Sequence, residues 1–86
     1  MPPERNSKPI SPDHAALGRA IEAVMAEKGV KQEALASTLG MDIKQLGSYV
    51  RGQGNPTYTT ILRISRALEI EAGRLIAIAD QLRREG

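Results

Sequence analysis

Residues 32–52, QEALASTLGMDIKQLGSYVRG, contain the pattern that decides the fold. Apolar side chains repeat there at helical spacing in two short groups, Leu35, Ala36 and Leu39 followed by Leu46, Tyr49 and Val50. Between the groups, Gly40 can take the positive φ that ends a helix, and Asp42 can cap the helix that follows. The stretch therefore predicts two short helices joined by a tight turn.

The second of these helices has a stripe opposite its apolar face. We expect that stripe to face solvent, and it consists of Ile43, Lys44, Gly47 and Ser48. Two helices closed by so tight a turn form a helix-turn-helix, and the second helix of that motif fits the major groove of DNA. The pattern predicts a DNA-reading surface on residues 43–51.

The rest of the chain predicts three further helices and no strand. Ser11 and Pro12 begin a helix that ends at Gly29, residues 57–68 form another, and residues 72–84 form the last. Residues 1–10 contain three prolines together with Arg5 and Lys8, which predicts a flexible arm. We expect an all-α domain of five helices over residues 11–86.

Composition indicates one small domain. The 86 residues can fold alone, although a chain of this size buries only about 60% of its unfolded surface. There is no cysteine, which excludes disulfides and thiolate metal sites and fits the reducing cytoplasm. The first residues lack the apolar run of a signal peptide, and no stretch is long enough to span a membrane. We therefore expect a cytoplasmic protein.

The net charge of the chain indicates less about a binding partner than the positions of its basic residues do. A net charge of +2 and a pI near 9.3 agree with a partner rich in phosphate, but many proteins without such a partner share these values. The basic residues in or beside the predicted helix-turn-helix are Lys28, Lys31, Lys44 and Arg51. Glu33 and Asp42 lie in the same stretch, so the pattern also fits ordinary surface charge.

The sequence offers little for catalysis. His14 is the only histidine, and its position in the first turn of a helix favours a capping or exposed role over metal binding or general-base chemistry. The segment GQGNP does not follow a strand or lead into a Lys-Ser or Lys-Thr pair, so it is no P-loop. Tyr49 and Tyr58 are the only aromatic residues, which argues against base stacking on single strands. We expect no enzyme activity, no cofactor and no metal.

From Leu17 to about Ala79 the chain resembles the phage-repressor and Cro-like (Xre-type) helix-turn-helix family. The resemblance rests on LGRAIEAVMAEKGVKQEALASTLGM, RGQGNP and ILRISRALEI. Within these segments the residues at the family's spacing are Gln32, Leu35, Ala36, Gly40, Gly52, Asn55 and Pro56. The resemblance implies a five-helix, lambda-repressor-like domain that binds double-stranded DNA sequence-specifically and regulates transcription as a repressor.

The resemblance also implies a role for individual residues. The positions that face base edges are Ile43, Lys44 and Ser48. The positions near the phosphate backbone are Gln32, Gln45, Arg51 and Asn55, to which we add Lys31. Their chemistry agrees, because Lys44 can donate to guanine O6 and N7, and Ile43 can contact a thymine methyl group. Gln32 begins a helix whose unpaired N–H groups favour a phosphate oxygen.

Four positions depart from the family pattern. Lys31 replaces a common Ser or Thr N-cap, at a cost of typically ~1 kcal/mol. Met25 and Val50 stand where the family often pairs Arg with Glu, so we expect both in the apolar core beneath the reading helix. Gly47 in the reading helix costs up to ~1 kcal/mol relative to alanine and either permits close approach to DNA or is simply tolerated.

Assembly and partners can also be inferred. One reading helix covers too few base pairs for useful selectivity, so we expect a homodimer, with Ile76 and Leu82 of the last helix at its interface. We expect the core to use Leu75, Ile78 and Ala79, and Leu82 to lie beyond the part of the helix that the core needs. One alternative is an antitoxin that binds a toxin protein and its own promoter, and another is a protein-interaction module that no longer reads DNA.

Overall fold

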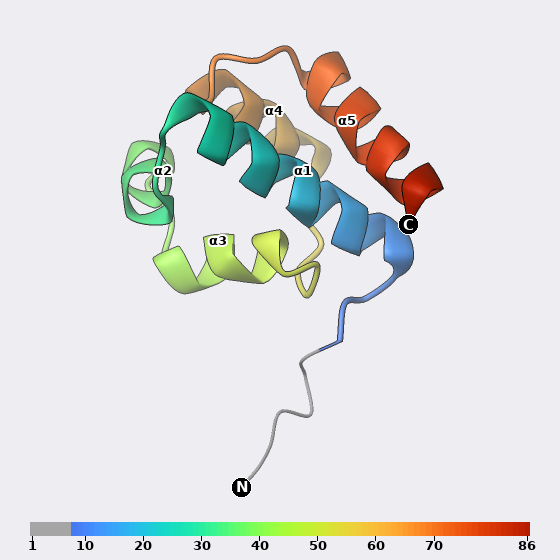
Figure 1. The fold of residues 1–86 in the computed structure, drawn as a ribbon. Helices are drawn as coiled ribbons and strands as arrows, with labels where there is room; N and C mark the ends of the chain where they lie inside the picture. Colours follow the sequence, from blue (N-terminus) through green and yellow to red (C-terminus); the bar gives the residue numbers. More distant parts are fainter. Residues whose placement is uncertain (1–7) are drawn as a thin grey trace, which may run out of the picture.

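The computed structural model describes residues 8–86, which form five α-helices and no strand. These helices are α1 (Pro12–Lys28), α2 (Gln32–Leu39), α3 (Ile43–Val50), α4 (Tyr58–Ala67) and α5 (Ala72–Glu85). α1 packs against both α5 and α3, and α2 packs against α3 and α4 (Figure 1). The predicted all-α class and the positions of its helices are confirmed. Most of the predicted arm, residues 1–7, lies outside the described residues.

Side chains cap the starts of helices, and glycines terminate them, largely as the sequence predicts. The Ser11 hydroxyl accepts from the backbone N–H of His14 at 3.1 Å, and the Asp42 carboxylate accepts from that of Lys44 at 2.8 Å. Gly40 ends α2 with a φ of 65°, a conformation that costs little only for glycine. Lys31, the N-cap residue of α2, makes no side-chain cap hydrogen bond, as expected from the replacement of the usual Ser or Thr.

One hydrophobic core fills the space between the helices. Its largest fully buried apolar side chains are Ile21, Val24, Leu35, Leu46, Ile64, Leu68 and Leu75. Met25 and Val50 also belong to this core, 5% and 9% exposed, so both residues at the family's ion-pair positions are apolar core residues as predicted. Leu82 packs against the same core and is half-buried, which differs from the expectation that the core ends before it. α5 therefore covers the core over nearly its full length.

A close backbone contact fixes α3 against α1. Gly18 is buried in α1, and a Cβ atom built on it would lie 2.2 Å from the Val50 carbonyl oxygen and 2.6 Å from that of Tyr49. These are backbone atoms, which cannot move aside as a flexible side chain could. Only glycine therefore fits at this position, and the end of α3 rests directly on the backbone of α1.

The loop after α3 is tied to the start of α1. Gly52 adopts a φ of 75° and packs so tightly that an added Cβ would lie 2.9 Å from the Cα of Ala15. The Gly52 carbonyl accepts from the backbone N–H of Ile10 at 2.8 Å, so the chain just before α1 is held by the same loop. At the other end of the motif, Arg63 of α4 donates to the Leu39 carbonyl at the end of α2.

No helix among residues 8–86 has the length and apolar character needed to cross a membrane.

Gly18→Ala is expected to lower the free energy of unfolding by about 2–3 kcal/mol, because the added methyl group must push α1 and α3 apart. Gly73→Ala is the matched control, since nothing lies within 4 Å of a Cβ at Gly73 and its φ needs no glycine. That control should be neutral or stabilising by up to ~1 kcal/mol. Urea titration followed by circular dichroism measures both changes, and equal stabilities of the two variants would contradict the close contact.

Candidate nucleic-acid interface

α3 has one face in the core and one face in solvent. Leu46, Tyr49 and Val50 are buried, whereas Ile43, the first residue of the helix, is 42% exposed. Lys44 follows on the exposed side, with its backbone N–H bonded to the Asp42 cap. An apolar side chain and a cation thus project together from the first turn of α3, as the sequence predicts for these two residues.

Ser48 and Gln45 make hydrogen bonds within α3. The Ser48 hydroxyl is half-buried and donates to the Gln45 carbonyl at 2.7 Å, so its oxygen remains able to accept a hydrogen bond but its proton is already used. The Gln45 side-chain amide is exposed and donates to the Tyr49 hydroxyl at 3.0 Å. That contact fixes the orientation of a side chain that we expect to approach a phosphate.

The prediction that Gly47 faces solvent is wrong, because two side chains cover it. Gly47 is buried, and a Cβ built on it would lie 2.9 Å from Nη1 of Arg51 and 3.5 Å from Oε1 of Gln32. The start of α2 and the end of α3 therefore meet over this glycine. The absence of a side chain at position 47 leaves the space in which the Arg51 guanidinium lies.

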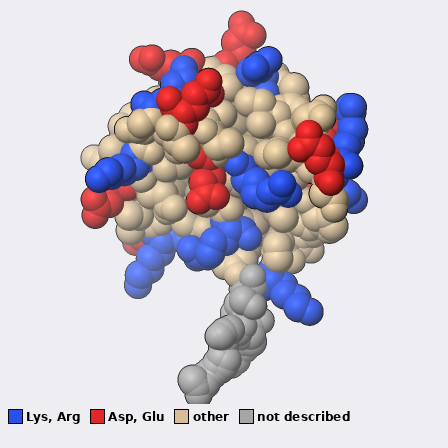
Figure 2. Space-filling model, in the orientation of Figure 1, with Lys and Arg blue, Asp and Glu red and all other residues tan. Residues whose placement is uncertain are grey.

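Two exposed basic residues, Arg51 and Lys31, lie at the end of α3 and directly before α2. Arg51 is exposed, and its Nε donates to Oε1 of Gln53 at 3.0 Å. Lys31, directly before α2, is exposed as well. Figure 2 shows Lys and Arg side chains along the lower edge of the molecule, where α3 lies in Figure 1, and Asp and Glu side chains mainly above them. A polyanion approaching this edge therefore meets mostly positive charge.

Asn55 belongs to a hydrogen-bonded link that the sequence did not reveal. Its Oδ1 lies 2.9 Å from Nε2 of His14, and Nδ1 of the same ring lies 2.6 Å from the Ser11 hydroxyl. The short spacing between Ser11 and His14 was visible in the sequence, but nothing there connects either residue to Asn55, which lies 41 residues after His14. The structure thus brings a predicted phosphate contact onto the first turn of α1.

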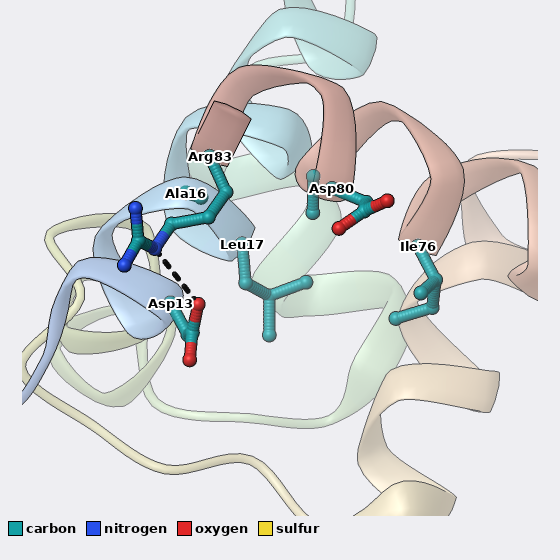
Figure 3. A pocket seen from close by; sticks show the side chains of 7 residues that line it. Asp13, Ala16, Leu17, Ile76, Asp80 and Arg83 are labelled. Atoms are coloured by element: carbon teal, nitrogen blue, oxygen red, sulfur yellow. Dashed lines mark hydrogen bonds and ion pairs between the residues drawn. The ribbon is translucent and has the colours of Figure 1, made fainter. Parts of the chain in front are cut away.

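A second surface feature lies between α1 and α5. It is an apolar groove of about 240 Å³, here called the α1–α5 groove, lined by Asp13, Ala16, Leu17, Ile76, Ala79, Asp80 and Arg83. Figure 3 shows Arg83 and Asp13 paired at one end, where Nε and Oδ1 are 2.9 Å apart, and Ile76 at the other. Ile76 is 45% exposed, so it is one of the few large apolar side chains on the described surface.

Residues 8–86 contain no group of three or more His, Asp or Glu side chains that could hold a metal ion. The polar residues on and beside the α3 surface include the cations Lys44 and Arg51, the Gln45 amide and the Ser48 oxygen, groups that suit phosphate oxygens and base edges. This arrangement can bind an anionic duplex by charge and hydrogen bonding.

Solved structures resemble this fold over most of the chain. The restriction-modification controller protein C.AhdI from Aeromonas hydrophila is 34% identical, with a TM-score of 0.73 over 76% of this chain and 98% of its own. The clp gene regulator ClgR from Corynebacterium glutamicum has a TM-score of 0.83 at 22% identity, over 85% of this chain and 78% of its own. A point mutant of the restriction-modification controller protein C.Esp1396I has a TM-score of 0.78 at 22% identity, over 86% of this chain and 99% of its own.

A family model described as helix-turn-helix, HTH_3, matches residues 21–75, from the middle of α1 to the first turn of α5. No curated protein matches the chain. The matched residues include the whole of α2, α3 and α4, with the turn and the loop that position the reading helix. The chain therefore belongs to the Xre/Cro-like helix-turn-helix family, and it is a DNA-binding transcriptional regulator and not an enzyme.

Proposed function

We propose that this protein is a sequence-specific repressor that reads the major groove of double-stranded DNA with α3. The observation that carries the proposal is the pairing of exposed Ile43 and Lys44 on the first turn of a helix whose opposite face is buried. Recognition helices of this motif contact base edges with their N-terminal residues. Lys44 suits guanine O6 and N7, Ile43 suits a thymine methyl group, and the Ser48 oxygen is left as an acceptor.

Flanking residues supply the contacts that hold the duplex in register. We assign phosphate contacts to Lys31, Gln32, Gln45, Arg51 and Asn55. Support comes from the meeting of Gln32 and Arg51 over Gly47, which gathers donors from two helices at one place. Such contacts fix the orientation of the protein but do not read sequence. Arg51 and Lys31 should also account for much of the salt dependence of binding.

The direction of regulation is part of the proposal. A domain bound over a promoter excludes other proteins from the same stretch of duplex, and such exclusion represses transcription. C.AhdI, the 34% identical structural neighbour, is named as a restriction-modification controller protein. We infer that the present chain likewise controls the expression of particular genes.

We further propose that the protein binds DNA as a homodimer through the exposed face of α5. Support comes from the α1–α5 groove, whose apolar lining includes Leu17 and Ala79 beside the exposed Ile76. An apolar surface of this kind is costly in water and suits a self-complementary two-fold contact. In the dimer, the two copies of α3 should lie about 34 Å apart, one turn of duplex. Leu82, half-buried in its own protomer, would contribute only the rest of its surface.

The role of Lys44 in reading bases should be separable by mutation from the role of Arg51 in binding the phosphate backbone of DNA. Lys44→Ala is expected to weaken binding to a preferred duplex by about 1–3 kcal/mol while changing affinity for a scrambled duplex much less. Arg51→Ala should weaken both duplexes to a similar extent and reduce the salt slope by about one. The preferred duplex is obtained by selecting bound sequences from a random pool, and gel-shift titrations at several salt concentrations measure each variant.

Arg66→Ala on α4 is the charge-matched control for Arg51→Ala, because it removes one exposed cation from a helix outside α3 and the proposed dimer face and should leave both affinities nearly unchanged. Equal losses on the two duplexes for Lys44→Ala would rule out its role as a base reader. A selection that enriches no sequence at all would refute sequence-specific binding.

The dimer can be tested with a charge placed in the α1–α5 groove. Ile76→Asp should give a folded monomer, with operator affinity lowered at least tenfold, because it introduces a charge into an apolar contact without touching the core. Ala26→Asp adds the same charge to an exposed position of α1 outside the α1–α5 groove and should preserve the dimer. Sedimentation equilibrium with and without DNA reports the mass. A wild-type chain that stays monomeric in both conditions contradicts the proposal, and co-purification of a second small protein would favour the antitoxin alternative.

A further inference from the structure

Hydrogen-bonded side chains join the loop after α3 to the first turn of α1, which lies outside the helix-turn-helix. The ring of His14 lies between them, with Nδ1 2.6 Å from the Ser11 hydroxyl and Nε2 2.9 Å from Oδ1 of Asn55. His14 is half-buried and Asn55 is exposed. The link therefore connects a helix cap inside the fold to an amide on its surface.

The hydrogen-bond pattern assigns a direction to this link. Oδ1 of Asn55 can only accept, so Nε2 of His14 must carry a proton. In the neutral ring Nδ1 then accepts from the Ser11 hydroxyl, whose oxygen also accepts from the backbone N–H of His14 at 3.1 Å. A neutral imidazole that accepts at Nδ1 carries its proton on Nε2. Nε2–H then donates to Oδ1 of Asn55, the only acceptor on that side chain. All three side chains are satisfied by one consistent arrangement.

The arrangement leaves one group of Asn55 for a ligand. Among the described residues, none accepts a hydrogen bond from Nδ2 of Asn55, whose side chain is exposed, so its two protons remain available to an approaching molecule. With its oxygen held by His14, the amide presents only donors to an approaching molecule. Donors are what a phosphate oxygen requires, whereas an exposed amide oxygen would repel it.

We propose that His14 is a positioning residue for DNA binding, which holds Oδ1 of Asn55 so that its Nδ2 amide group donates to a phosphate of the duplex backbone. This inference rests on the proposed function, since it assumes that the loop after α3 approaches DNA. His14 itself does not touch the duplex. It acts by fixing the rotamer and the orientation of the amide before binding, which removes part of the entropy cost of ordering that side chain.

The backbone of the loop does not depend on His14. The Ile10 N–H bond to the Gly52 carbonyl and the tight packing of Gly52 on Ala15 hold the loop against α1 independently. Removal of the imidazole should therefore release the Asn55 side chain without moving the loop. The cap of α1 should also survive, because the Ser11 oxygen accepts from the backbone N–H of residue 14, a bond that does not need the imidazole.

Duplex affinity of four variants tests the proposal, measured on a duplex selected by the wild-type chain and on a scrambled one. His14→Ala and Asn55→Ala should each weaken both duplexes about threefold to tenfold, as expected for one phosphate hydrogen bond. The double variant should lose no more than Asn55→Ala alone, because His14 acts only through Asn55. His14→Gln should recover most of the affinity, since its Nε2 can donate to Oδ1 of Asn55 in place of the ring.

Asn55→Asp is the matched control for the donor group. The carboxylate still accepts from His14, so thermal stability should stay at or above that of the wild type, but the Nδ2 donors are gone and a negative charge faces the duplex. We expect a loss of affinity greater than that of Asn55→Ala. His14→Ala can also be compared in two backgrounds. If it lowers duplex affinity as much in the Asn55→Ala variant as in the wild type, His14 acts on DNA by another route and the proposal is overturned.

Nitrogen-15 spectra of the free protein test the link without DNA. The ring of His14 should be protonated at Nε2, and the Asn55 side-chain amide should be ordered in the wild type and become mobile in His14→Ala. A ring protonated at Nδ1 alone would mean that the amide is turned round, with its oxygen outward, and would overturn the proposal. Failure of the wild type to bind any duplex removes the proposed function and this role with it, while the spectra still decide whether the hydrogen bond exists.

Discussion

The contact of Gly18 with the carbonyl groups of Tyr49 and Val50 determines where the reading helix lies. No side chain separates α1 from the end of α3 there, so the two backbones meet directly and the position of α3 is fixed. α1 packs along its length against α5 as well (Figure 1). The same helix thus connects the surface that we propose to read DNA with the groove that we propose to join two protomers. A rigid connection is what a defined spacing between two reading helices requires.

The polar groups of the surface that we propose to face DNA are held by hydrogen bonds within the protein before any ligand arrives. Gln45 donates to the Tyr49 hydroxyl, Arg51 donates to Gln53 and lies over Gly47, and Asn55 is held by His14. Each partner restrains a long or exposed side chain that would otherwise have to be ordered on binding. Such preorganisation reduces the entropy cost of association and leaves more of the contact energy as affinity.

Membership of the family gives the fold and the general activity, and the surface residues must supply the rest. A shared fold can host different partners, because recognition depends on the side chains that it displays. In this chain the residues to which we assign recognition are Ile43 and Lys44 on the first turn of α3, and Ile76 beside the α1–α5 groove. The replacement of the family's ion pair by Met25 and Val50 concerns the core beneath α3, and burying two apolar side chains there avoids the cost of desolvating charges.

The sequence by itself determined the five helices, their approximate ends and the buried face of α3, because these follow from local spacing, capping residues and glycines such as Gly40. It also identified Ile43, Lys44 and Arg51 as exposed residues near the motif. Only the tertiary structure decided that Gly47 is covered by Gln32 and Arg51, and that His14 reaches Asn55. It likewise decided that Leu82 packs on the core. These contacts join residues from different helices and loops, and a periodic pattern along one helix contains no information about what another element brings against it.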